Sequence, residues 1–211
     1  MRIGNSQIKG LIFDLYDTLI YIENKTNPFK FLLQKLVIDQ QKYGEIRAKL
    51  MTRNYDSINE LGQELGITDQ GVIKKTEELI KLEIDSTNLF AESYEVLEKL
   101  RVKYQLYLLS NVMSTYKKPY EDLNLDRLFD RAYFSCDIGL KKPQVEMFEQ
   151  PLKENKLGVK EVIMIGNSYT SDYLGGISAG IKSILVDRKN LTKVSEDIDR
   201  VSNLKELLAI L

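Results

Sequence analysis

The chain has 211 residues, 43% of them hydrophobic, which allows one large domain or one domain with a smaller insert around a sizeable core. Its 30 basic and 31 acidic residues nearly cancel, so no basic surface favours nucleic acid. It contains no histidine and one cysteine, Cys136, which excludes histidine-based nucleophilic pairs, an internal disulfide and the usual zinc sites.

Short apolar runs rich in β-branched or aromatic residues predict five strands, at residues 8–14, 105–110, 132–135, 161–166 and 183–187. Helical patterns occupy residues 93–101, 144–155, 171–179 and 204–210. The strands are apolar without alternation, as expected when both faces are covered. Strands that alternate with helices in this way predict an α/β fold, with a parallel sheet and helices on both faces.

The gap after the first strand breaks this alternation. From about residue 23 to residue 90 we find no strand, and four amphipathic helical segments follow one another, at residues 28–40, 43–53, 57–66 and 68–84. A helical block of this length is too long for one crossover connection. We therefore predict a core of residues 1–22 and 89–211, with an all-helical cap inserted at residues 23–88.

Polar side chains follow four of the predicted strands, and ligands of open parallel sheets bind beyond the carboxyl ends of the strands. In chain order these residues are Asp14, Tyr16, Asp17 and Thr18, then Ser110 and Asn111, then Lys141 and Lys142, and finally Asn167, Ser168 and Asp172. Each group alone has an ordinary explanation as a helix cap or a solvated loop. Asp14 is the hardest to explain in this way, because it ends an apolar run and a buried carboxylate is costly unless paired.

The segments DLYDTL, LLSNV, GLKKP and IGNSYTSDYLGGISAG, in this order, resemble the four motifs of the haloacid dehalogenase superfamily of hydrolases. The resemblance covers residues 9–211, and the helical insert lies where members with a cap of the first type carry theirs. It implies a Rossmann-like core and a covalent aspartyl intermediate, but it does not fix the substrate.

The resemblance also implies a role for each matching residue. Asp14 falls on the nucleophile, and Lys142 falls on the lysine that neutralises the developing charge. Thr18 and Ser110 fall on the hydroxyl groups that hold the phosphate or carboxylate of the substrate. Such roles agree with the chemistry, because a carboxylate that attacks a phosphate dianion meets repulsion that cations must cancel.

A Mg²⁺ site and two substrate contacts complete the expected site. The implied Mg²⁺ ligands are Asp14, the Tyr16 carbonyl, Asn167 and Asp172. Tyr16 and Asn111 are expected to contact the substrate.

Two positions depart from the phosphatase pattern. Tyr16 stands where the family usually has the aspartate that protonates the leaving group, and a phenol is a poor base at neutral pH. Asp17 is a poor substitute, because its side chain in an extended strand would point the other way, and we expect it to stabilise a turn. Asn167 replaces a metal-binding aspartate, which lowers the charge available to Mg²⁺.

These departures leave three functions open: a metal-dependent phosphatase of modest rate, a metal-independent hydrolase of 2-haloacids, and a binding module with weak or no catalysis. The haloacid branch also has a tyrosine at the position of Tyr16, and it needs an arginine for the substrate carboxylate, for which Arg47 and Arg53 are candidates. Against that branch, Phe148 stands where haloacid enzymes have a tyrosine.

The expected surroundings are those of a soluble cytoplasmic protein. No apolar run of about 18 residues could span a membrane, and the first residues lack the apolar core of a signal peptide. A helical cap favours a small soluble metabolite as substrate, which Tyr21, Lys25, Phe29 and Lys30 could contact. Cys136 is expected to be a buried, inert thiol, and the oligomeric state stays open.

Overall fold

A computed structural model describes residues 8–190, 193 and 197–211 of the chain. Six strands form one parallel sheet in the order β5-β4-β1-β6-β7-β8. The strands are β1 (Gly10–Phe13), β4 (Gln105–Ser110), β5 (Arg131–Phe134), β6 (Val162–Gly166), β7 (Lys182–Val186) and β8 (Arg200–Val201). The five predicted strands are confirmed to within two residues at each end, and the short β8 is an addition.

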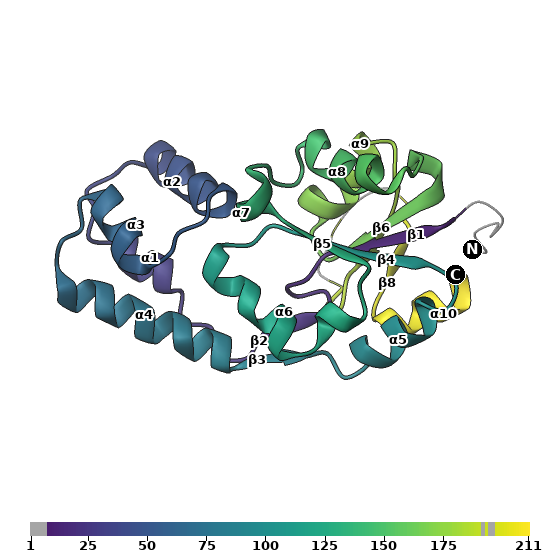
Figure 1. Cartoon of the computed structure of the whole chain (residues 1–211), viewed down its shortest axis with the longest axis horizontal. Coiled ribbons are helices and arrows are strands. Elements are labelled where there is room, and N and C mark those ends of the chain that lie inside the picture. Colours follow the sequence, from purple (N-terminus) through teal and green to yellow (C-terminus); the bar gives the residue numbers. More distant parts are fainter. Residues whose placement is uncertain (1–7, 191–192, 194–196) are drawn as a thin grey trace.

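Helices cover both faces of this sheet, as predicted, and the alternation of side chains along β1 places the two layers. Leu11 and Phe13 belong to one buried cluster, whereas Ile12 belongs to a second one. The first cluster includes residues of α5 (Ser93–Leu100) and α10 (Leu207–Ile210). The second includes residues of α8 (Val145–Asn155), beside which α9 (Gly175–Ser178) packs. Figure 1 shows these two helix pairs on opposite sides of the strands.

Shorter helical turns connect the strands, and the sequence patterns did not predict most of them. They are η1 (Ser114–Lys117), α6 (Lys118–Asp122), η2 (Leu125–Arg127), α7 (Ser135–Ile138), η3 (Val159–Glu161) and η5 (Leu204–Glu206). The predicted helix over residues 171–179 begins instead as a π-helical segment, η4 (Tyr169–Leu174), before α9.

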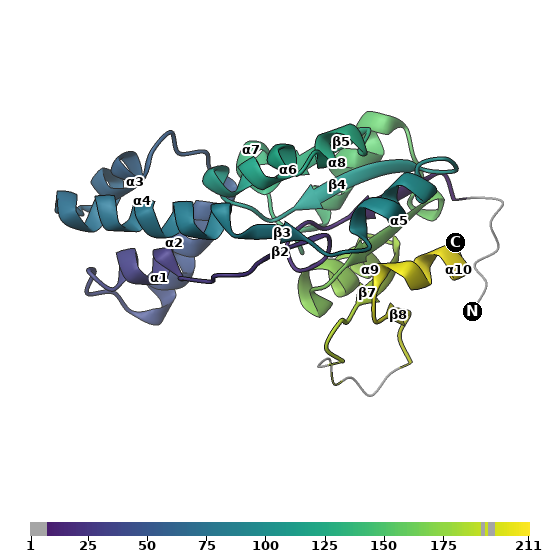
Figure 2. The same ribbon diagram turned by 90° about the horizontal axis from the view of Figure 1, so that it is seen from below.

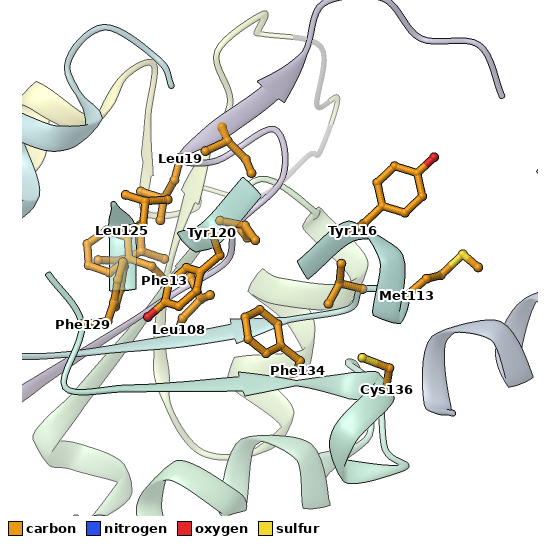
Figure 3. Packing of buried hydrophobic residues seen from close by; sticks show 14 of the residues in the cluster. Phe13, Leu19, Leu108, Met113, Tyr116, Tyr120, Leu125, Phe129, Phe134 and Cys136 are labelled. Carbon is orange, nitrogen blue, oxygen red and sulfur yellow. The ribbon is translucent and has the colours of Figure 1, made fainter. Parts of the chain in front are cut away.

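Aromatic rings pack β1 and β5 against the segments that connect the strands (Figure 3). Phe13 meets Phe129 edge to face, with ring centroids 6.1 Å apart, and Tyr120 meets Phe134 in the same way at 5.5 Å. Such contacts add to the free energy gained from burial alone. In the same region Cys136 is 3% exposed, and burial raises the pKa of its thiol to about 11, which confirms the prediction of a buried thiol.

Four helices lie between the first two strands of the main sheet, as predicted for the insert. They are α1 (Pro28–Leu33), α2 (Gln40–Thr52), α3 (Ile58–Leu65) and α4 (Gln70–Asp85). The sequence specifies where three of them begin, because the side chains of Asp39, Ser57 and Asp69 cap α2, α3 and α4. Figure 1 shows this helical group beyond the carboxyl end of β1, and Figure 2 shows the same arrangement from below.

The expectation of no strand between residues 23 and 90 was wrong. The chain enters the helical group through β2 (Ile20–Ile22) and leaves it through β3 (Thr87–Leu89), and these two strands pair antiparallel with Ile22 opposite Thr87. The assignment of residues 23–88 to a separate cap stays a prediction. In the described part of the chain, no helix is both long enough and apolar enough to cross a membrane.

Candidate active site

The candidate site lies at the point where the direction of strand addition reverses. From β1 the chain builds β4 and β5 on one side, and then β6 and β7 on the other. Open α/β sheets have a crevice at such a reversal, beyond the carboxyl ends of the strands. Asp14 directly follows β1, and its backbone N–H donates to the carbonyl of Ile165 at 2.9 Å. Asp14 is therefore the residue that the topology aims at this crevice.

A buried ion triad joins three of the predicted site residues. The Lys142 ammonium lies 2.7 Å from Asp14 Oδ1 and 2.6 Å from Asp172 Oδ1, and the whole lysine is only 2% exposed. Burial lowers the pKa of Lys142, but the two carboxylates outweigh it and hold that pKa above its usual value. Lys142 is thus a permanent cation between two acids that come from distant parts of the chain.

The charge state of Asp14 depends on the same contacts. Burial raises the pKa of Asp14 and the Asp172 charge adds to the effect, while Lys142 opposes both, so that the pKa of Asp14 is about 6. A carboxylate with this pKa is ionised at neutral pH and is still a stronger base than an exposed aspartate. That is a suitable state for a nucleophile.

Asn111 fixes the loop that carries Lys142. Its side-chain Oδ1 accepts from the Lys142 backbone N–H, and its Nδ2 donates to the Lys142 carbonyl, both at 2.8 Å. Asn111 directly follows β4, so this two-way contact ties the lysine loop to the sheet beside β1. The Asn111 side chain thus positions Lys142, a role that the sequence analysis did not predict for Asn111.

Asp172 is placed by the segment that follows β6. Its Oδ2 accepts from the Ser168 backbone N–H at 2.8 Å, and the Ser168 hydroxyl in turn accepts from the Ser171 N–H at 3.1 Å. The carboxylate lies so close to Gly166 that any Cβ at that position would clash with it. The glycine in the GNSYTSD segment is therefore a steric requirement of this carboxylate.

Two hydroxyl residues were expected beside Asp14, and the structure brings one into contact. Thr18 Oγ1 lies 3.1 Å from Asp14 Oδ2 and 3.3 Å from Asn167 Oδ1. Ser110 ends β4, the neighbour of β1, and is 1% exposed. Among the described residues, however, its hydroxyl makes no hydrogen bond to another residue of the predicted site.

Tyr16 occupies the position of the missing acid, and its hydroxyl is already engaged. The hydroxyl donates to the Tyr116 carbonyl at 2.9 Å, and the two rings meet edge to face at 6.2 Å. Burial, assisted by the Glu83 charge, raises the pKa of Tyr16 well above its usual value. At neutral pH this phenol neither loses its proton nor has it free for a leaving group.

Asp17 lies in a turn, and the expectation of an extended backbone there was wrong. Its φ is +58°, and its N–H donates to the Ile20 carbonyl at 2.6 Å. Its half-exposed carboxylate lies 3.3 Å from the ammonium of Lys25. This geometry supports the expected role of Asp17 in stabilising the turn that leads into β2.

A cavity of about 490 Å³ lies between the helical group and the loops of the site. Tyr16 and Asn111 belong to its wall, as do Lys25, Phe29 and Lys30, three of the residues expected near the substrate. The fourth, Tyr21, is not among the lining residues and packs on the ring of Phe90, with centroids 4.9 Å apart.

The two candidate arginines differ in position. Arg47 lines the cavity. Arg53 lies outside it and pairs with Glu60 and Glu64 on the surface. Of the two, only Arg47 is placed to contact a small molecule in the cavity.

The oxygen atoms around Asp14 suit a hard cation in type but carry little charge. Asp14 and Asp172 contribute two carboxylates, and Asn167 Oδ1 lies near the Thr18 hydroxyl that also contacts Asp14. Within the described residues, no group of three or more acidic, histidine or cysteine side chains could hold a metal ion. These atoms therefore offer at most two charged ligands, so any Mg²⁺ bound here would be held weakly and would keep several of its waters.

The sequence analysis missed two residues that support the site. Glu83 is buried in α4 and accepts the hydroxyl hydrogen bond of Tyr116. The sequence did offer a signal for Glu83. It continues the helical spacing of the buried Ile73, Thr76 and Ile80, where an acidic residue is unexpected. Arg188 follows β7 closely and donates to the Thr18 carbonyl at 2.8 Å, so extending the list of strand ends to the fifth strand would have found it.

Comparisons with known proteins identify a family of hydrolases. The sequence profile of the haloacid dehalogenase-like hydrolases matches residues 8–180. A glyceraldehyde 3-phosphate phosphatase of Methanothermobacter thermautotrophicus is 31% identical over 119 residues, which are 50% of this chain and 51% of that protein. A ribulose-1,5-bisphosphate 5-phosphatase of Halopiger xanaduensis is 25% identical over 121 residues, or 56% and 51% of the two chains. The chain thus spans about half the length of the curated relatives it matches.

Solved structures share the fold over nearly the whole chain. A HAD phosphatase from Thermococcus onnurineus superposes with a TM-score of 0.70 at 21% identity, covering 96% of this chain and 97% of that one. The putative HAD-hydrolase YfnB from Bacillus subtilis, bound to magnesium, superposes with a TM-score of 0.68 at 20% identity. This superposition covers 97% of this chain and 98% of that one. A 2-haloacid dehalogenase from Pseudomonas syringae also gives 0.68, at 18% identity and coverages of 96% and 97%. At these identities the likeness concerns the fold alone.

Proposed function

The chain belongs to the haloacid dehalogenase-like hydrolases, and on that premise we propose that it is a Mg²⁺-dependent phosphate monoesterase of modest rate. Its substrate is a small metabolite, and its nucleophile is Asp14. The observation that carries the proposal is the buried contact of Asp14 with Lys142, which in turn contacts Asp172. Relatives named as sugar-phosphate phosphatases support the same substrate class.

In the proposed reaction, a carboxylate oxygen of Asp14 attacks the phosphorus and the bond to the ester oxygen breaks. The leaving alkoxide takes its proton from water, because the hydroxyl of Tyr16 is committed to the Tyr116 carbonyl. Water then hydrolyses the aspartyl phosphate. Thr18 and Ser110 hold phosphate oxygens, and Lys142 offsets the charge that develops on them. The lack of an acid at position 16 is the reason for a modest rate, since such a group contributes about 10²–10⁴-fold.

Mg²⁺ would be held by Asp14, the Tyr16 carbonyl, Asn167 and Asp172, and it would supply positive charge opposite the transferred phosphate. The similar Bacillus subtilis structure is described as bound to magnesium, which supports the choice of this metal. Since Asn167 brings no charge, we expect weaker binding of Mg²⁺ than in a site with three carboxylates.

A second candidate is the metal-independent hydrolysis of 2-haloacids. Two observations favour it: Tyr16 stands at the position of the acid, and Arg47 lines the cavity, where it could hold a carboxylate. A halide leaves without a proton, so this reaction tolerates the missing acid. A binding module without catalysis is the third outcome.

A two-by-two assay separates these functions. A chromogenic phosphate monoester and 2-chloropropionate are each incubated with the protein, once with Mg²⁺ and once with a chelator. We expect phosphate release only in the presence of Mg²⁺. Chloride release in the chelator would favour the haloacid reaction, and no release in any mixture would favour the binding module.

Asp14→Asn tests the nucleophile in the same assay. It should abolish either reaction, because an amide neither attacks phosphorus nor displaces a halide at a useful rate. Hydrolysis that survives in a folded Asp14→Asn protein would mean that another group is the nucleophile.

A further inference from the structure

The wall of the cavity under the helical group carries two positive charges that no acidic side chain of the described residues neutralises. Besides the core residues Tyr16 and Asn111, three cationic side chains line it: Lys25, Lys30 and Arg47. Lys25 is partnered by Asp17. Within the described part of the chain, Lys30 and Arg47 make no ion pair.

Helix α2 carries three basic residues, and they differ in whether an acidic side chain pairs with them. Lys42 pairs with Glu45, and Lys49 pairs with Glu64. Arg47 is the one that has no carboxylate partner among the described residues, and it is also the one that lines the cavity. Its guanidinium lies 6.0 Å from the centre of the Tyr43 ring, a contact that limits its orientation without neutralising its charge.

The acidic residues in the cavity wall do not offset these cations. Asp17 is taken up by Lys25. Glu83 accepts from the backbone N–H groups of Thr26 and Asn27 at 2.6 and 2.8 Å, and from the Tyr116 hydroxyl. Both acids therefore have their own partners, and Lys30 and Arg47 are left available to a ligand.

The remaining wall suits a carbon skeleton. Phe29, Leu50, Met51 and Met113 supply apolar surface between the cations and the loops that carry Tyr16 and Asn111. Asp14 does not line the cavity itself, but Tyr16, two residues later in the chain, does. A molecule with its phosphate at Asp14 would therefore enter the cavity beside Tyr16 and run past the apolar wall toward Lys30 and Arg47.

We propose that Lys30 and Arg47 form a second anion subsite, and that the substrate is a metabolite with one phosphate ester at Asp14 and a second acidic group at its other end. This inference rests on the proposed function and narrows its substrate class. The second group is a carboxylate or a phosphate, since a guanidinium and an ammonium bind both. The subsite therefore selects a substrate by the charge of its second group and by the distance of that group from the phosphate, while the hydrolysis itself takes place at Asp14.

The test measures binding, so that it does not depend on turnover. Isothermal titration of the Asp14→Asn protein uses three esters on one five-carbon skeleton: n-pentyl phosphate, the same ester with a terminal carboxylate, and the skeleton with a phosphate at each end. A matching three-carbon set varies the reach. We expect at least one doubly acidic ester to bind about tenfold or more tightly than its singly charged counterpart, and the better of the two identifies the second group.

Substitutions assign the preference to the two side chains. In Asp14→Asn protein that also carries Lys30→Met and Arg47→Met, the affinities for the doubly acidic and the singly charged ester should differ by no more than about threefold. Arg53→Met is the matched control, because Arg53 is the other arginine of the region and pairs on the surface with Glu60 and Glu64. It should keep the full preference. The preference should also weaken as salt is added, as expected for exposed charges.

The outcomes separate this subsite from the proposed function. Equal binding of all esters, or a preference that survives the loss of both cations, overturns the subsite even if the wild-type protein hydrolyses phosphate esters. A preference that depends on Lys30 and Arg47 supports the subsite. If the wild-type protein then releases no phosphate from any ester, the proposed function fails alone.

Discussion

Asp14, Asp172 and Lys142 together carry one net negative charge in a buried space. A phosphate monoester brings about two more, so the lysine alone leaves the attack of Asp14 electrostatically unfavourable. A 2-haloacid brings a single negative charge, which lies on its carboxylate and not on the group that is attacked. The triad therefore links the choice of substrate to the presence of Mg²⁺: with the metal it suits a phosphate, and without it a monoanion.

The first prediction concerns the pH dependence set by Asp14, whose pKa is about 6 in the folded protein and 3.8 without its surroundings. Because the folded state binds this proton more tightly, Asp14 lowers stability as pH rises from 4 to 7. Relative to Asp14→Asn, and without Mg²⁺, the free energy of unfolding of the wild type should fall by about 2 kcal/mol across this window. Urea titrations of both proteins at several pH values measure the difference, and a flat difference would contradict the raised pKa.

The same group sets the activity profile. Attack requires the ionised carboxylate, so kcat/KM should decrease as pH falls below about 6, and Mg²⁺ bound to Asp14 should move this decrease to lower pH. An acid limb that does not move with Mg²⁺ concentration would contradict a metal bound at Asp14.

The second prediction concerns Tyr16. Tyr16→Asp supplies an acid at the position where the family pattern expects one, and the phosphatase rate should rise at least tenfold over that of Tyr16→Phe. The phenylalanine variant is the matched control, because both changes remove the hydroxyl bond to Tyr116. Single-turnover rates with the chromogenic ester measure the effect. Equal rates in two folded proteins that bind Mg²⁺ would contradict this account of the position.

At the scale of elements, Arg188 connects the segment after β7 to the turn that carries Thr18. Its Nη2 donates to the Thr18 carbonyl at 2.8 Å, and its Nη1 donates to Glu92 Oε1 at 2.6 Å. The guanidinium lies 3.6 Å from the centre of the Phe90 ring, beside the exit of β3. One side chain thus holds the turn after β1 and the chain after β3 against the sheet.

The third prediction follows from this arrangement. Arg188→Met should lower kcat about tenfold or more by freeing the Thr18 turn, and should cost about 1.5–3 kcal/mol of stability through the lost charged hydrogen bonds. Arg188→Lys should recover only part of both, since an ammonium cannot reproduce the planar fork. Arg127→Met, at an exposed arginine with no ion pair among the described residues, is the control and should change neither. Stability loss with unchanged kcat would make Arg188 structural only.

The elements that the sequence predicts well are those whose residues face one environment throughout. The buried strands are apolar on both faces, so β1 and β6 appear as continuous runs. β8 has only two residues and carries no such pattern. β3 was missed because it follows α4 directly, and because its partner β2 lies far away in the sequence.

The same distinction applies to the site. Asp14 directly follows β1, so the sheet alone places it. Lys142 and Asp172 lie further from their strands, and the contacts of Asn111 and Ser168 bring them to Asp14. The commitment of the Tyr16 hydroxyl to Tyr116, and the left-handed turn at Asp17, depend on contacts and loop geometry that no local pattern encodes.

At the scale of the whole molecule, a chain of contacts joins the site to the helical group. Tyr16 donates to the carbonyl of Tyr116, and the Tyr116 hydroxyl donates to Glu83 in α4. Glu83 also holds the backbone of Thr26 and Asn27, the segment that leads into α1. The tyrosine that replaces the acid is therefore part of the connection that sets how the helices lie over the site.

The fourth prediction tests this connection. Tyr116→Phe leaves one oxygen of buried Glu83 without its donor, which should cost about 1–3 kcal/mol. Tyr94→Phe, at an exposed tyrosine of α5, is the matched control and should change stability by less than about 0.5 kcal/mol. Urea unfolding of both variants gives the comparison, and equal midpoints would mean that the Tyr116 hydroxyl contributes nothing to holding the helices.

The pairing of β2 with β3 has a consequence for how this molecule could diversify. Because Ile22 and Thr87 lie opposite each other, the points where the helices join the sheet are already held together. The cost of closing the intervening segment grows only slowly with its length. Residues 28–82 could therefore be lengthened, shortened or exchanged, provided that Glu83 and the backbone it holds at Thr26 and Asn27 stay in place. New ligand preferences could arise there while the chemistry beneath is inherited unchanged.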